Sequence, residues 1–82
     1  MDYSKMTISE IAVVIMDNWG KVYFGAVPYL EAMLTLNSII DPYYNDSGTS
    51  IVAYFLSNAT TWKGQVAREV KVELNKRLKA NC

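Results

Sequence analysis

Apolar residues recur at helical spacing in the segment that follows Thr7. They lie at i, i+3, i+4, i+7 and i+11, on one face of an α-helix: Ile8, Ile11, Ala12, Ile15 and Trp19. Thr7 and Glu10 have the T-x-x-E spacing of a capping box, in which the two side chains accept hydrogen bonds from free backbone N–H groups. The sequence therefore predicts a helix that begins after Thr7 and is ended by Gly20.

A second helix is predicted to begin at Pro28, because proline loses no hydrogen bond at the first helical position. Its pattern continues at helical spacing through Leu30, Met33, Leu34, Asn37 and Ile40. Asp41 and Pro42 are expected to stop it, and the turn-forming residues of 41–48 predict a loop. Three aromatic residues are expected to pack the turn between the first two helices: Tyr23, Phe24 and Tyr29.

Two more helices are predicted in the second half of the chain. Asp46 or Ser47 caps the third, which runs through Val52, Phe55, Leu56 and Ala59, although its β-branched start leaves a strand as the alternative. Thr60 or Thr61 caps the fourth, whose apolar positions are Val66, Val70, Leu74 and Leu78. We therefore expect an all-α fold, a compact bundle of about four short helices, in a single domain that spans residues 1–82.

The composition excludes most familiar catalytic sites. The chain has no His, which excludes imidazole catalysis and His-containing zinc sites, and its one Cys, Cys82, has no partner for an internal disulfide. The longest apolar run, Ile11 to Met16, is far shorter than the roughly 20 residues of a membrane helix, and no secretory leader opens the chain. We expect a non-enzymatic cytoplasmic protein with no metal, no cofactor and no membrane contact.

The loop 41–48 holds a possible carboxylate pair. Asp41 and Asp46 could serve acid–base chemistry or bind a cation, but their spacing does not match a calcium-binding loop. Capping of the third helix explains Asp46 and its neighbour Ser47 better than catalysis does. No catalytic residue is therefore proposed.

The aromatic residues suggest a protein-binding surface. Ten are present, which is many for so small a core, so some must reach the surface. Tyr43 and Tyr44 are adjacent in a polar loop and cannot both face inward, and tyrosine is enriched at interfaces. The candidate protein-binding residues are Tyr43, Tyr44, Trp62 and Lys63.

The charges suggest a second surface. Net charge is zero, but residues 1–61 carry −4 and residues 62–82 carry +4. Arg68, Lys71, Asn75 and Lys79 lie together opposite the apolar face of the last helix. Such a stripe either follows a row of phosphates or is an ordinary solvated face. The candidate nucleic-acid-binding residues are Lys63, Arg68, Lys71 and Lys79.

Four apolar residues fall outside the main helical stripes and leave self-association open as a third possibility: Val13, Val14, Met16 and Val72. They could equally pack against a neighbouring helix. The chain is therefore a possible homo-oligomer with a structural or assembly role.

Three segments of the chain resemble a group of small proteins encoded by tailed bacteriophages: residues 18–29 (NWGKVYFGAVPY), residues 46–56, which run from Asp46-Ser47-Gly48 to Tyr54-Phe55-Leu56, and residues 58–64 (NATTWKG). The likeness spans roughly residues 7–79 and brings no functional residue with it. From it we expect a glycine in the loop before Asp46, where this chain has Tyr43-Tyr44-Asn45.

The resemblance implies a setting, the host bacterial cytoplasm during infection. Small non-enzymatic phage proteins commonly act there by occupying a surface of a host protein. The leading hypothesis is a stoichiometric inhibitor of a host protein or complex, such as a CRISPR or other defence nuclease. The alternatives are a nucleic-acid-binding accessory protein and a self-associating assembly protein.

Overall fold

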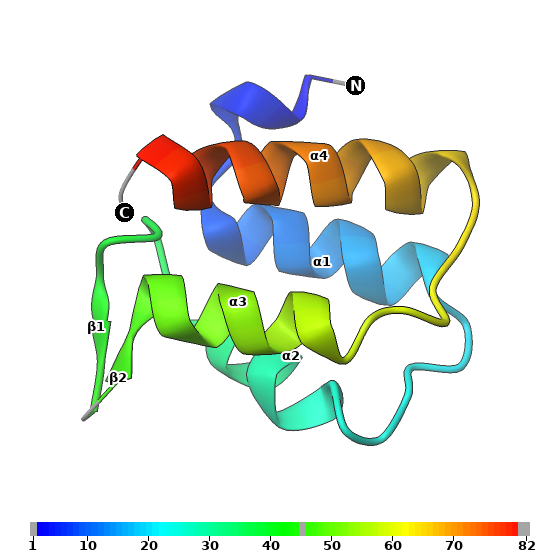
Figure 1. Ribbon diagram of the computed structural model, residues 1–82, viewed down its shortest axis with the longest axis horizontal. Coiled ribbons are helices and arrows are strands. Elements are labelled where there is room, and N and C mark those ends of the chain that lie inside the picture. Colours follow the sequence, from blue (N-terminus) through cyan, green and yellow to red (C-terminus); the bar gives the residue numbers. More distant parts are fainter. Residues whose placement is uncertain (1, 45, 81–82) are drawn as a thin grey trace.

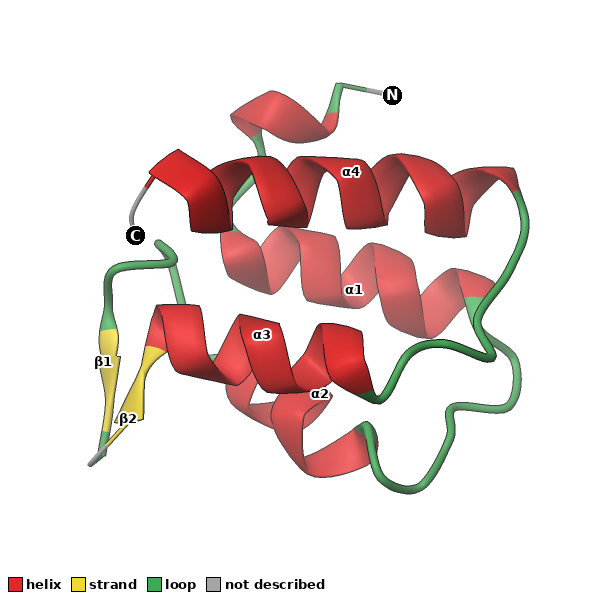
Figure 2. Cartoon of the chain, viewed as in Figure 1, coloured by secondary structure: helices red, strands yellow, loops and turns green. Residues whose placement is uncertain are grey.

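The protein is described by a computed structural model that covers residues 2–44 and 46–80, so Cys82 lies outside the described residues. Within these ranges the chain forms a 3-10 turn, four α-helices and a two-stranded antiparallel hairpin (Figures 1 and 2). The elements are η1 (Tyr3–Lys5), α1 (Ile8–Asn18), α2 (Val27–Met33), β1 (Pro42–Tyr43), β2 (Asp46–Ser47), α3 (Gly48–Ser57) and α4 (Gln65–Ala80). The fold is therefore mostly α, as expected, but the hairpin means that it is not purely so.

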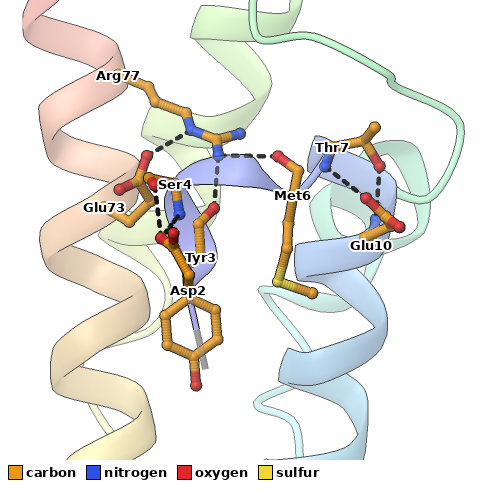
Figure 3. A network of polar contacts seen from close by, with 8 residues as sticks. All are labelled: Asp2, Tyr3, Ser4, Met6, Thr7, Glu10, Glu73 and Arg77. Atoms are coloured by element: carbon orange, nitrogen blue, oxygen red, sulfur yellow. Dashed lines mark hydrogen bonds and ion pairs between the residues drawn. The ribbon is translucent and has the colours of Figure 1, made fainter.

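Helix α1 is confirmed together with its cap. The Thr7 hydroxyl accepts from the Glu10 N–H at 3.1 Å, and the Glu10 carboxylate accepts from the Thr7 N–H at 2.8 Å (Figure 3). All five residues of the predicted apolar face are buried, Trp19 included. The helix ends at Asn18, just before the expected stop, with Trp19 as its C-cap.

Helix α2 is much shorter than its sequence pattern predicts. It ends at Met33 rather than near Ile40, and Leu36 and Ile39 are buried while Ile40 is exposed. The backbone carbonyls of residues 36 and 37 accept from the N–H groups of Ser9 and Ile8, at 2.8 and 3.2 Å. These carbonyls satisfy donors in the first turn of α1, so tertiary contacts end the helix where local spacing would continue it.

Helices α3 and α4 follow in the predicted order. Ser47 caps α3 by accepting from the Ser50 N–H at 3.3 Å. Helix α4 begins at Gln65, later than the predicted caps at Thr60 and Thr61, because the chain first makes a turn through Gly64, whose φ of 115° strongly favours glycine.

The helices pack around one apolar core. In Figure 1, α4 lies along α1, α3 lies below α4, and α2 lies beneath α3, with the hairpin at one end. Arg77 ties the N-terminal turn to α4: its Nη2 donates to the Tyr3 and Met6 carbonyl oxygens, both at 2.8 Å, and its Nε pairs with Glu73 at 2.7 Å (Figure 3). A single guanidinium therefore joins the two ends of the described chain.

Candidate functional site

Tyr44 is the most exposed large side chain on the hairpin. Its side chain is 90% exposed, and its backbone φ of 53° lies in the left-handed region that favours glycine. Its ring meets the ring of Tyr43 edge to face, with centroids 4.8 Å apart. Tyr43 is half-buried and packs against the core, so the pair holds one ring inward and offers the other to solvent.

The base of the hairpin is fixed by backbone hydrogen bonds. The Asp41 carbonyl oxygen accepts from the Gly48 N–H at 2.7 Å, and the Asp41 carboxylate accepts from the N–H groups of Asn37 and Ser38 at 3.0 and 3.1 Å. A Cβ at Gly48 would collide with the Ile39 carbonyl oxygen. The Asp41 carboxylate thus stabilises a turn, and the hairpin that carries Tyr44 is fixed at its base by hydrogen bonds.

Trp62 lies in the core rather than on the surface. Its side chain is 3% exposed and stacks on Trp19 with ring centroids 5.7 Å apart and an interplanar angle of 15°. Its neighbour Lys63 is exposed. An alanine at Trp62 would therefore test the fold before it tested an interface.

The structure separates the four candidate protein-binding residues into two places. Tyr43 and Tyr44 precede α3, whereas Trp62 and Lys63 follow it at the opposite end of the helix (Figure 1). Ten helical residues span about 15 Å at 1.5 Å each. The hairpin and the Trp62 turn are thus distinct sites.

Three of the candidate nucleic-acid-binding residues lie on α4, and the fourth, Lys63, lies in the turn before it. A hollow of about 340 Å³ is lined by Trp62, Lys63, Gly64, Ala67, Arg68 and Lys71. A second hollow of about 610 Å³ is lined by Arg68, Lys71, Val72, Asn75, Lys76 and Lys79. The two share Arg68 and Lys71, so all four candidate cations border one continuous stretch of the α4 surface.

Lys71 differs from the other cations of this surface. Its Nζ donates to the Trp62 carbonyl oxygen at 2.7 Å and lies 6.0 Å from the centroid of the Trp62 ring. Partial burial, with a smaller contribution from the charge of Lys63, lowers the pKa of Lys71 below its usual value. Lys71 therefore anchors the turn before α4 as well as carrying charge.

Two of the three aromatic residues expected to pack the turn between the first two helices are exposed instead, Phe24 and, at 42%, Tyr23. The side chain of Phe24 is 79% exposed, and its ring contacts that of Tyr23, with centroids 4.7 Å apart. Tyr29 is half-buried and contacts Tyr54 instead. The position of Phe24 next to Gly25, in a segment with no helical periodicity, was the available signal.

Among the described residues, no cluster of three or more acidic, Cys or His side chains could hold a metal ion. Nor does any helix within residues 2–44 and 46–80 have the length and apolar character needed to cross a membrane. No protein family model, curated protein or solved structure matches this chain.

Proposed function

We propose that this chain is a non-enzymatic protein-binding module of a tailed bacteriophage, which acts in the host bacterial cytoplasm. It inhibits a host protein or complex, such as a CRISPR or other defence nuclease, by occupying one of its surfaces. The observation that carries the proposal is the 90% exposed ring of Tyr44 on an anchored hairpin.

An exposed tyrosine in this position suits a binding role for two physical reasons. Its ring buries a large area on contact and has few rotatable bonds, so it loses little entropy when a partner fixes it. Its positive φ is also the conformation that a tight turn between β1 and β2 requires, and it fixes the ring at the tip of the hairpin. Ile40 and Pro42, both exposed, add apolar surface on the same segment.

The test is affinity capture from infected host lysate, treated with nuclease, by the tagged wild-type protein and by Tyr44→Ala. We expect one host protein in near-equal amount with the wild type and its loss with Tyr44→Ala. Phe24→Ala is the matched control, because it removes another highly exposed ring, 79% exposed, from a different part of the surface. Equal capture by Tyr44→Ala and wild type would refute the hairpin as the site, and recovery of the bait alone would refute the function.

A second candidate function is nucleic-acid binding by α4. It is favoured by the absence of any ion pair between Lys63, Arg68, Lys71 or Lys79 and another residue within the described part of the chain. Binding by these residues would weaken linearly in a plot of log affinity against log salt, with a slope of about −0.9 per phosphate neutralised on a duplex. Lys79→Gln should reduce that slope by about 1, and a flat salt response would exclude the function.

A further inference from the structure

We propose that this chain binds a second copy of itself, with the outer face of α1 in one copy seated on the outer face of α4 in the other. The surfaces involved are not those of the hairpin. The proposal therefore stands independently of the protein-binding function above.

The outer face of α1 has an acidic–apolar–acidic pattern. Val13 is 49% exposed although it is apolar, and it lies between Glu10 and Asp17 on the side of the helix away from the core. Asp17 forms no ion pair with a described residue. The two acidic residues are seven positions apart, about 10.5 Å along the helix axis.

The outer face of α4 is mainly basic around an exposed valine, and the one carboxylate at its edge, Glu69, accepts from the Gln65 side chain at 3.0 Å. Val72, 64% exposed, lies between Arg68 and Lys76 and forms part of the hollow of about 610 Å³. Both flanking cations are exposed and neither forms an ion pair with a described residue, although local hydrogen bonds and, to a lesser degree, the charge of Lys76 lower the pKa of Asp2. These two cations are eight positions apart, about 12 Å along the axis.

The two patterns match in register. Suppose that Val13 of one copy rests on Val72 of the other. Along α1 the two carboxylates then lie about 4.5 and 6 Å from Val13, and along α4 the two cations lie about 6 Å on either side of Val72. Each carboxylate then faces a cation whether the helices run parallel or antiparallel. Burying two exposed valines at the centre of two ion pairs gives the apolar centre and charged rim of a protein interface.

A second copy is the partner that carries both halves of this complementarity. Zero net charge removes overall repulsion between copies. Two copies either exchange both contacts in a closed pair or make one contact each and grow into a chain. A single helix face is smaller than the ~800 Å² per partner of a standard interface, so the association should be weak and sensitive to salt.

The test is sedimentation equilibrium of the full chain at low and high salt, at concentrations up to about 1 mM, which half-saturates an association with a dissociation constant of about 1 mM. At low salt we expect an average mass above the 9.3 kDa of one chain, falling towards it at high salt. Asp17→Lys and Lys76→Glu should each associate at least about tenfold more weakly, because each places like charges in contact. A mixture of the two variants should recover association, since each supplies the intact face that the other lacks.

Two variants serve as matched controls. Glu31→Lys and Lys5→Glu make the same charge changes at exposed residues outside both faces, and they should associate as the wild type does. A 9.3 kDa mass for the wild type at low salt overturns the proposal. So does equal behaviour of Asp17→Lys and Glu31→Lys, or a mixed sample that stays monomeric. All these variants retain the hairpin, so capture of a host protein by them tests the proposed function separately.

Discussion

Replacing Trp62 with alanine should destabilise the whole fold rather than remove a surface contact. The ring is 3% exposed and stacks on Trp19 at a centroid distance of 5.7 Å, and Trp19 in turn meets Phe55 edge to face at 6.3 Å. Loss of the Trp62 ring therefore leaves a cavity beside two other core aromatic residues.

The magnitude follows from this burial. Truncation of a buried aromatic side chain to alanine costs about 3–5 kcal/mol, of which about 1 kcal/mol reflects the aromatic pair itself. At about 0.05–0.15 kcal/mol per residue, a chain of 82 residues has a total free energy of unfolding of about 4–12 kcal/mol. Trp62→Ala should therefore remove between a quarter and all of the stability.

The assay is urea unfolding followed by far-ultraviolet circular dichroism. Fluorescence is unsuitable because the substitution removes one of two tryptophans. Trp62→Phe, which keeps a ring in the core, should lose less than half as much stability, and Lys63→Ala at the exposed neighbour should stay within about 0.5 kcal/mol of wild type. A loss of less than about 1 kcal/mol for Trp62→Ala would show that the core argument is wrong.

Three further predictions concern the local interactions that hold the fold. Arg77→Met should lower the free energy of unfolding by about 2 kcal/mol, because it removes charged hydrogen bonds to two carbonyls. Lys76→Met, at an exposed neighbour, should leave it almost unchanged, and equal urea midpoints for the two variants would contradict this. Gly48→Ala should lower the melting temperature because its Cβ would collide with a backbone carbonyl, whereas Gly20→Ala should not, because nothing lies within reach of its Cβ. A lower melting temperature for Gly20→Ala than for Gly48→Ala would disprove the contact. Thr7→Ala should cost about 1 kcal/mol in urea unfolding by removing the cap of α1, and an unchanged midpoint would count against the capping box.

The hairpin illustrates a limit of sequence patterns. The segment 41–48 was predicted as a loop from its turn-forming residues, and Ser47 was predicted as a cap. The two short strands depend on Asp41, whose carboxylate holds the backbone of residues 37 and 38 and whose carbonyl binds Gly48. These contacts span only three to seven positions, but they are polar contacts in a turn and leave no hydrophobic periodicity from which the strands could be predicted.

The candidate surfaces were predictable to different degrees. The basic residues of α4 follow from helical spacing alone, and the structure keeps them on one face. The exposure of Tyr44 was expected from two adjacent tyrosines, but not which of the two would face solvent. The exposure of Phe24 and the burial of Trp62 were not predicted, because aromatic side chains are found in both environments.

The sequence by itself determined the four helices, the capping of α1 and α3, and the apolar faces that form the core. These depend on residues three or four positions apart, whose interactions are set by helix geometry. Two features were decided only by the tertiary structure: the position at which α2 ends, and the burial of Trp62 in the core. The carbonyls of residues 36 and 37 serve donors of α1, and Trp62 stacks on Trp19 from more than forty residues away. Partners so far apart in the chain meet only when the helices have packed.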